Sequence, residues 1–277
     1  MCRWISYSGN PIALDELLIK PKISLIDQSM SSRMTAKPTN GDGFGVGWYN
    51  QQGEPGVYRS VQPAWNDQNL KELAHHIQSS LFLAHVRRST GTPVQQSNCH
   101  PYRYGNWLFV HNGLLRDFQK IKRDLTLAID PSLYPQLSGS TDSELMFFLA
   151  LTLGLQKDPF PALEKMVGLI EKIAAGYNIE HPVQMTLGLS DGSRLMAVRY
   201  SSEGKSRTLF HSNSITALRE LYPDHERLGV FPDNARGIVS EPLNDEISEA
   251  WIEIPESTAV MAVDGDLELL PFNPRFS

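Results

Sequence analysis

The chain begins Met1-Cys2-Arg3-Trp4-Ile5-Ser6-Tyr7-Ser8 (MCRWISYS), in which a strand-like run over Cys2–Ser8 starts on a cysteine. A cysteine at the second position means little by itself. Removal of the initiator methionine is favoured before a small residue, however, and would leave a thiol and a free α-amine on Cys2. An α-amine titrates near neutral pH and can serve as the base for the adjacent nucleophile. We therefore expect Cys2 to be a catalytic nucleophile, held at the start of a strand.

The composition is that of an ordinary globular chain. Of the 277 residues, 41% are hydrophobic and 20% are charged, which excludes a disordered chain, a coiled coil and a fibrous repeat. The net charge of -6 argues against a general nucleic-acid binder. Cys2 and Cys99 are the two cysteines and form no CxxC pair, so neither a disulfide framework nor a zinc site is expected. Cys99 is predicted to be a small buried filler.

No targeting or membrane segment is expected. The first 22 residues lack a basic region followed by an apolar one, so they do not read as a signal peptide. The longest apolar run, Leu145–Leu155, is too short to span a bilayer and is predicted to be a buried helix. We expect a cytoplasmic protein with no membrane partner.

Hydrophobic periodicity predicts mixed strands and helices, then two helices, then antiparallel strands. The predicted helices are Asp67–Ser80, Asp142–Leu155 and Pro161–Ala175. Besides Cys2–Ser8, the predicted strands are Phe44–Tyr49, Leu81–Arg87, Trp107–His111, Val183–Ser190, Arg194–Tyr200, Trp251–Ile254, Ala259–Val263 and Asp266–Leu270. This order predicts an α+β layered sandwich built on antiparallel sheets rather than a doubly wound fold.

An arginine pair follows one of the predicted strands, in AHVRRSTGTP (Ala84–Pro93). By itself, this pattern is typical of a strand end with solvated charges. The functional alternative is that Arg87 and Arg88 form a fork at the strand end, because a guanidinium can hold a carboxylate through two hydrogen bonds.

Another predicted strand ends in His111-Asn112-Gly113. Asn-Gly is a common turn dipeptide, so a plain exit from the strand is one interpretation. The other is an oxyanion hole, since the Asn112 side-chain amide and the Gly113 backbone N–H would supply two donors. His111 is a candidate general base, but the α-amine of Cys2 could do that work without it.

Two further motifs frame the candidate site. Thr141 and Glu144 fit a capping box at the start of a helix, and Asp142 in its first turn could pair with a substrate ammonium. The glycine-rich run Asn40–Trp48 (NGDGFGVGW) does not fit a phosphate loop, so we expect a turn leading into a tightly packed strand. The eight histidines show no metal-ligand spacing, and we expect no metal and no cofactor.

Taken in order, these motifs resemble a known family. Cys2 followed by DGFGVGW, HVRRSTG, HP, VHNG and STDSE is similar to the class II glutamine amidotransferase domain, an N-terminal-nucleophile hydrolase. The stand-alone members, bacterial amidotransferase-like proteins and γ-glutamyl amidases, are the most similar. The resemblance implies a four-layer αββα sandwich in one domain, residues 1–277. The motifs would lie in residues 2–150, and residues 180–277 would complete the sandwich with strands.

The resemblance also implies roles for single residues. Cys2 would attack the δ-carboxamide, with its own α-amine as base. Asn112, through its side chain, and Gly113, through its backbone N–H, would form the oxyanion hole. Arg87 would hold the α-carboxylate of the glutamyl group, and Asp142 its α-ammonium. An amino-acid head group needs one cation and one anion beside the acyl site, and these residues supply them.

Some positions carry softer implications or depart from the family. Thr90 and His100 fall where the family shapes and hydrogen-bonds the pocket. Biosynthetic members usually begin Cys-Gly-Ile, whereas Arg3 and Trp4 follow the cysteine here. Arg88 stands where an aromatic residue is common. These departures concern the rim of the pocket and hence the leaving group.

The predicted reaction is hydrolysis of glutamine to glutamate and ammonia through a γ-glutamyl thioester on Cys2. The ammonia could pass to a synthase partner in trans, since we expect no room in 277 residues for an attached synthase. One alternative is a stand-alone γ-glutamyl amidase that acts on a thiol or peptide conjugate. A second is a non-catalytic regulatory module, disfavoured because the whole catalytic set is present. The sequence does not predict the oligomeric state.

Overall fold

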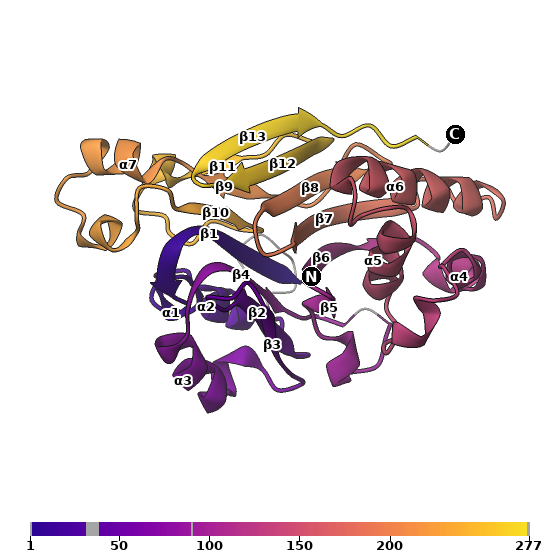
Figure 1. Ribbon diagram of the computed structural model, residues 1–277, viewed down its shortest axis with the longest axis horizontal. Coiled ribbons are helices and arrows are strands. Elements are labelled where there is room, and N and C mark those ends of the chain that lie inside the picture. The colour runs from indigo at the N-terminus through magenta and orange to yellow at the C-terminus, as the bar shows by residue number, and fades with distance from the viewer. Residues whose placement is uncertain (1, 32–38, 90, 276–277) are drawn as a thin grey trace.

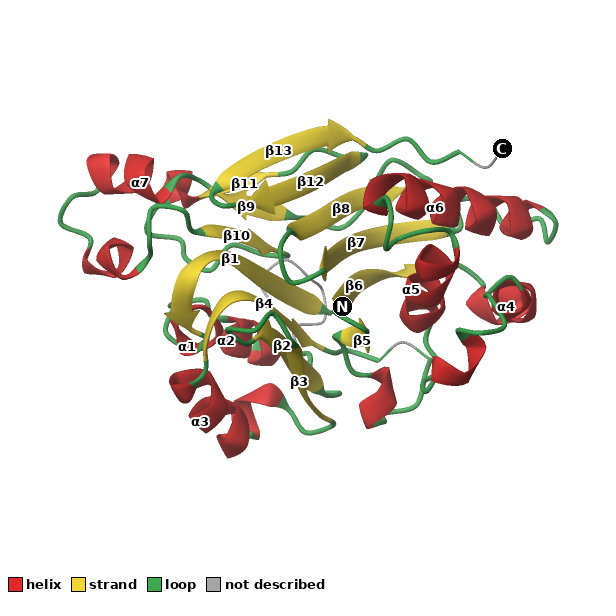
Figure 2. Cartoon of the chain, in the orientation of Figure 1, coloured by secondary structure: helices red, strands yellow, loops and turns green. Residues whose placement is uncertain are grey.

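Two antiparallel sheets face each other in the computed structural model, which describes residues 2–31, 39–89 and 91–275. The first sheet has the strand order β11-β9-β10-β1-β4-β2-β3, and the second has the order β13-β12-β8-β7-β6-β5. Figures 1 and 2 show helices on both outer sides of this pair. The four-layer αββα sandwich predicted from the sequence is confirmed.

The strands and helices have the following bounds. The first sheet consists of β1 (Arg3–Ala13), β2 (Phe44–Tyr49), β3 (Pro55–Ser60), β4 (Gln78–Val86), β9 (Phe210–Ser212), β10 (Arg236–Val239) and β11 (Trp251–Glu253). The second consists of β5 (Tyr102–Tyr104), β6 (Trp107–Leu115), β7 (Val183–Ser190), β8 (Leu195–Ser201), β12 (Thr258–Val263) and β13 (Asp266–Pro271). The helices are α1 (Asp15–Leu18), α2 (Leu25–Met30), α3 (Gln68–His76), α4 (Phe118–Leu127), α5 (Asp142–Thr152), α6 (Pro159–Ala175) and α7 (Ile215–Leu221).

Three hydrophobic clusters hold these layers together. One joins the outer face of the first sheet to α1, α2, α3 and α7, and another joins the second sheet to α4, α5 and α6. The third fills the space between the sheets. Burial of apolar surface at all three interfaces drives the assembly. Within the described ranges, no helix combines the length and the apolar character needed to cross a membrane.

Side-chain alternation along the central strands decides which residues face the space between the sheets. On β1, Ile5 packs under the helices, whereas Trp4 belongs to the cluster between the sheets. Cys2, two residues before Trp4, therefore lies on the inner face. On β4, Leu83 also belongs to the inner cluster, so Arg87 continues on that same face.

The strand register brings the start of β1 beside the end of β4. Arg3 lies opposite Val86. Cys2, just before β1, is therefore the neighbour of Arg87, just after β4, at the ends of these two central strands. In Figure 2 this end of β1 lies near the centre of the molecule and close to β6, with which β1 is in contact. Cys2 is thus held between the two sheets, as expected from the strand-like start.

The glycine-rich run packs as predicted. A Cβ atom on Gly45 would overlap the carbonyl oxygen of His100. One on Gly47 would lie 2.9 Å from Leu108 and 3.0 Å from Pro101. Strand β2 therefore needs glycine here so that the Cys99–Pro101 loop and β6 can approach its backbone.

Several sequence-based boundaries were wrong, and two of them concern strands that lead to candidate site residues. The helix predicted over Asp67–Ser80 ends at His76, and residues 78–80 already belong to β4. The strand predicted to end at His111 runs on to Leu115, so Asn112 and Gly113 lie within β6 and form no turn. Pairing with β7 explains this extension, since every residue from 108 to 115 has a partner there.

The predicted capping box at Thr141 forms only in part. Thr141 Oγ1 accepts a hydrogen bond from the Glu144 backbone N–H at 3.1 Å, as expected for an N-cap. The Glu144 carboxylate does not return to the Thr141 backbone. It accepts hydrogen bonds from the N–H groups of Ser138 (3.0 Å) and Gly139 (2.8 Å), and so holds the preceding loop against α5.

Candidate active site

The Cys2 thiol lies against the backbone that follows β4. Its Sγ atom accepts a hydrogen bond from the Arg88 N–H (3.3 Å) and lies 3.5 Å from the Arg88 carbonyl oxygen. Burial raises the pKa of Cys2, although the Arg88 backbone contact and the charges of Arg87 and Arg3 lower it in part. The thiol is therefore protonated near neutral pH and needs a base before it can attack.

Arg3 holds the backbone at this point. Its Nη1 donates to the Cys2 carbonyl oxygen at 2.8 Å, and its Nη2 forms a buried ion pair with Glu241. The Trp4 N–H donates to Ser240 Oγ at 3.1 Å. Arg3 and Trp4, which depart from the family's usual Gly-Ile, thus fix the position of Cys2 through contacts with the end of β10.

Arg87 is a buried cation whose partners are all neutral. Its side chain is only 3% exposed, and Nη2 donates to Thr92 Oγ1 at 2.7 Å and to the Pro93 carbonyl at 3.2 Å. Nη1 donates to the Asp42 carbonyl at 3.3 Å. Among the described residues, no carboxylate forms an ion pair with it. A buried, uncompensated guanidinium is well suited to bind a carboxylate from a ligand.

Asp142 supplies the opposite charge. Its Oδ2 accepts from the Leu115 N–H at 2.9 Å, and its Oδ1 accepts from the Ser143 N–H at 2.8 Å. The carboxylate lines a cavity of about 350 Å³ together with Thr92, the residue that Arg87 holds. The structure therefore brings the anion and the loop around the cation to one cavity, and this arrangement can bind an amino-acid head group. The other lining residues are Gly91, Leu114, Leu115, Asp117, Phe118, Gln119 and Lys120.

Asn112 and Gly113 follow one another on β6. Asn112 is buried on the inner face, and its carbonyl oxygen accepts from Thr186 Oγ1 at 3.3 Å. Thr186 Oγ1 in turn accepts from Trp4 Nε1 at 3.1 Å, which links this part of β6 to the strand that begins beside Cys2. A Cβ atom on Gly113 would overlap the Gln184 carbonyl, so only glycine fits between β6 and β7.

His111 does not share the face of Cys2. It lies between Phe109 and Leu115 in the alternation of β6 toward the helices, and its Nδ1 is 2.8 Å from Ser143 Oγ on α5. Burial lowers its pKa, although the nearby Asp142 opposes this effect. The imidazole therefore contacts the helix start that carries Asp142, and the α-amine of Cys2 stays the predicted base.

His100 is buried against two other rings. Its ring centroid lies 4.1 Å from that of His85 and 4.7 Å from that of Tyr102. Burial lowers the pKa values of both histidines, that of His85 to about 3, even though a contact with the His111 backbone opposes the shift of His85. His100 thus packs as a neutral ring behind the site. Thr90, which the resemblance also places at the pocket, lies outside the described residues.

Asn98 is a site residue that the sequence did not single out. Its Nδ2 donates to the Pro93 carbonyl at 2.9 Å, which is also a partner of Arg87. Its Oδ1 accepts from the Ser140 N–H at 2.8 Å, two residues before Asp142. No local signal could have found it, because its link to the Asp142 loop goes through Ser140, 42 residues away. The neighbouring Cys99 is fully buried, as predicted.

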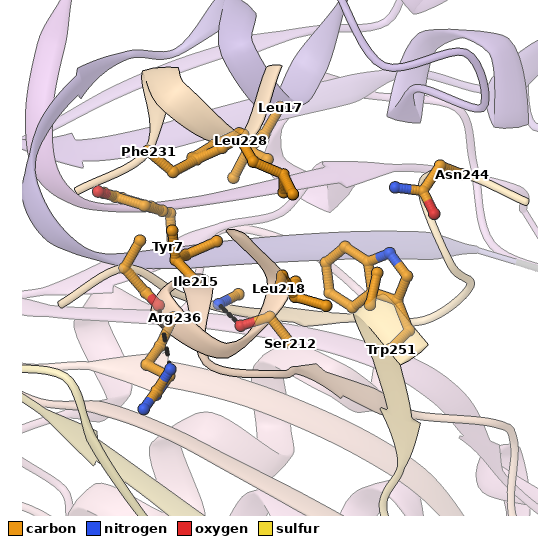
Figure 3. A pocket seen from close by; sticks show the side chains of 13 residues that line it. Tyr7, Leu17, Ser212, Ile215, Leu218, Leu228, Phe231, Arg236, Asn244 and Trp251 are labelled. Atoms are coloured by element: carbon orange, nitrogen blue, oxygen red, sulfur yellow. Dashed lines mark hydrogen bonds between the residues drawn. The ribbon is translucent and has the colours of Figure 1, made fainter. Parts of the chain in front are cut away.

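A second pocket lies on the opposite face of the first sheet. Figure 3 shows this apolar pocket of about 80 Å³ between the sheet and the α7 region. Tyr7, which lines it, points away from the face that carries Cys2. The pocket is therefore separate from the candidate active site. In the part of the chain that the structure describes, no group of three or more histidine, cysteine or acidic residues is arranged to hold a metal ion.

This architecture is that of the N-terminal-nucleophile hydrolases. A glutamine aminotransferase class-II domain protein from Silicibacter pomeroyi superposes with a TM-score of 0.75 and 30% identity, covering 99% of each chain. The glutamine phosphoribosylpyrophosphate amidotransferase of B. subtilis has a TM-score of 0.66 at 13% identity. It covers 99% of this chain and 50% of that one, and this likeness concerns the fold alone.

The sequence comparisons define the family. Residues 17–276 match the glutamine amidotransferases class-II. The "Probable glutamine amidotransferase DUG3" of Saccharomyces cerevisiae is 35% identical over 93% of this chain and 80% of that protein. The γ-glutamyl-hercynylcysteine sulfoxide hydrolase of Mycolicibacterium smegmatis is 27% identical over 98% of this chain and all of that one. The chain belongs to the class II glutamine amidotransferase family.

Proposed function

We propose that the chain hydrolyses the γ-amide bond of glutamine through a γ-glutamyl thioester on Cys2. The observation that carries this proposal is the position of Cys2 beside Arg87, a buried cation whose partners among the described residues are neutral. Asp142 on the adjoining cavity completes an amino-acid head-group site. We further propose that residues 1–277 form a single domain and that it acts in the cytoplasm, where a thiol nucleophile stays reduced.

In the acylation half, Met1 has been removed and the α-amine of Cys2 takes the thiol proton, directly or through water. The Sγ atom then attacks the carbonyl carbon of the δ-carboxamide and forms a carbon–sulfur bond. The Asn112 amide and the Gly113 N–H donate to the resulting oxyanion. When the intermediate collapses, the carbon–nitrogen bond breaks and the ammonium of Cys2 returns the proton to the departing nitrogen. Ammonia leaves, and the thioester remains.

In the deacylation half, the α-amine of Cys2 takes a proton from water, and the oxygen attacks the thioester carbon. The same two donors stabilise the second oxyanion. The carbon–sulfur bond breaks, glutamate leaves and the thiol regains its proton. The head group stays bound to Arg87 and Asp142 throughout.

Burial raises the pKa of the Cys2 thiol. The acylation step therefore needs a nearby base to take the thiol proton.

A γ-glutamyl amidase activity is the second candidate. It is favoured by the similarity over 98% of the chain to a protein named γ-glutamyl-hercynylcysteine sulfoxide hydrolase. The chemistry on Cys2 would be the same, and only the departing amine would differ. In the first candidate, ammonia could pass to a synthase partner in trans. Activity that requires a partner would favour that version, whereas cleavage of γ-glutamyl conjugates by the isolated protein favours the amidase.

The test compares ammonia release from glutamine by the wild type, Cys2→Ala and Asn112→Ala. We expect Cys2→Ala to be inactive, and loss of one oxyanion donor to slow turnover by ~100–1000-fold. Cys99→Ala is the matched control, because Cys99 is the other cysteine of the chain, is fully buried and has no role in the proposed reaction, so this variant should keep activity. A fully active Asn112→Ala enzyme would overturn the assignment of the oxyanion hole.

A further inference from the structure

A second arginine lies on the other side of Cys2 from Arg87. In the first sheet, Phe210 is opposite Val239, and Val239 is opposite Ile5. Extending this register by three residues, past the start of β9 and the end of β10, brings Arg207 into the same row as Cys2. In this row, Arg207 precedes β9, the second strand from β1, whereas Arg87 follows β4, the neighbour of β1 on the opposite side.

The Arg207 side chain shares the face of the nucleophile. Leu209, two residues later, is fully buried in the cluster between the sheets, which is the cluster that also contains Trp4. The segment stays alongside β10, because Thr208 Oγ1 donates to the Ser240 carbonyl at 2.9 Å. Alternation along this segment therefore directs Arg207 toward the same space as Cys2.

No residue that the structure describes supplies a counter-ion to the guanidinium of Arg207. Among the described residues, its side chain takes part in no ion pair or hydrogen bond, and its buried Nε atom has no acceptor. The nearby Arg3 is already paired with Glu241. Burial and the charge of Arg3 both lower the pKa of Arg207, so both destabilise its charged form. An anion supplied by a ligand would relieve this cost.

We infer that Arg207 binds an anionic group on the departing amine of the substrate. The inference rests on the proposed function, in which Arg87 holds the acyl half. Cys2 then lies between two cations, one for each half of the bond that breaks. The preferred substrates are γ-glutamyl amides of amines that carry a carboxylate, such as amino acids and short peptides with a free C-terminus.

The test is a ratio of kcat/KM values for two matched amides, γ-glutamylglycine and γ-glutamylethylamide, which differ in the charge on the leaving group. We expect the wild type to prefer the anionic amide by about 10- to 100-fold, the range of a charged hydrogen bond. Arg207→Met should bring the ratio close to one, and Arg207→Lys should keep part of it. Arg123→Met is the matched control, because that side chain is 84% exposed on α4.

Each outcome decides the inference. A ratio near one in the wild type overturns it, as does a ratio that survives in Arg207→Met. Because the ratio is measured within one protein, a lower fraction of active enzyme does not affect it. Glutamine is assayed in parallel. If the wild type cleaves none of the three amides, the proposed function itself fails, and the inference fails with it.

Discussion

Asn98 and Ser140, 42 residues apart, join the two loops that flank the candidate head-group site. Asn98 Nδ2 donates to Ser140 Oγ at 3.1 Å, and the Ser140 N–H donates to Asn98 Oδ1 at 2.8 Å. Asn98 Nδ2 also donates to the Pro93 carbonyl oxygen, which accepts a second hydrogen bond from Arg87. One buried amide thus sets the spacing between the cation Arg87 and the anion Asp142.

We predict that Asn98→Asp raises KM for glutamine more than it lowers kcat. An aspartate cannot donate to the Pro93 carbonyl, so the loop around Arg87 is no longer held by this hydrogen bond. The contacts of Cys2 are unchanged. The lost hydrogen bonds should also cost about 1–3 kcal/mol of stability. Ser140→Ala, which removes only the hydroxyl, should show a smaller change. Steady-state kinetics would contradict this prediction if kcat fell and KM stayed the same.

Arg87 and Asp142 should discriminate separate parts of the substrate. Arg87→Lys should lower kcat/KM for glutamine by about 10- to 100-fold, because an ammonium cannot reproduce the planar fork. The same variant should act on 4-aminobutanamide, which lacks the α-carboxylate, as well as the wild type does. Asp142→Asn should show the complementary pattern with glutaramate, which lacks the α-amine. Equal losses on all substrates would argue against these roles.

Gly113 should not tolerate any side chain. In Gly113→Ala, the new Cβ would overlap the Gln184 carbonyl and lie 2.5 Å from His111 Nε2. Strands β6 and β7 would have to separate, so we expect a lower Tm and loss of turnover. Gly105→Ala provides a comparison, because a Cβ there meets nothing within 4 Å, although its φ of 54° adds strain. A Gly113→Ala enzyme with wild-type Tm would contradict the close packing.

The free energy of unfolding should decrease as the pH is lowered, in part because His85 is buried as a neutral ring. Burial and then the charge of Arg87 lower its folded pKa to about 3, whereas an unfolded histidine titrates near 6.5. The unfolded chain therefore binds the extra proton between about pH 6.5 and 3, and each pH unit removes up to about 1.4 kcal/mol. The stabilisation that comes from keeping His85 neutral is therefore fully present above about pH 6.5 and is lost as the pH falls toward about 3. His85→Gln should show a shallower fall in unfolding free energy between pH 7 and 5 by urea denaturation; equal slopes would be inconsistent with a buried neutral ring.

Local sequence patterns predicted a layered α+β sandwich and singled out two charged candidates for the head-group site. Alternation located β2 and β7 to the residue, and the apolar run after Asp142 located α5. Arg87 was found because it directly follows a strand, and Asp142 because it begins a helix. Both signals lie within a few neighbouring residues.

Contacts distant in sequence could not be predicted in this way. The extension of β6 past Asn112 depends on pairing with β7, more than 70 residues later. The ion pair of Arg3 with Glu241 spans 238 residues. Strands β9 and β10, which complete the first sheet around Cys2, are only three and four residues long and carry little periodicity of their own. Tertiary pairing decides these features, so they appear only in the folded chain.

The most direct test of the account asks which atom carries the acyl group. Wild-type protein is mixed with glutamine, quenched in acid during turnover, and its N-terminal peptide is analysed by mass spectrometry. We expect a peptide that begins at Cys2 and carries one γ-glutamyl group on its sulfur, and this species should accumulate more slowly in Asn112→Ala. An active enzyme that retains Met1, or that carries the acyl group on Cys99 or on any other residue, would contradict the central claim.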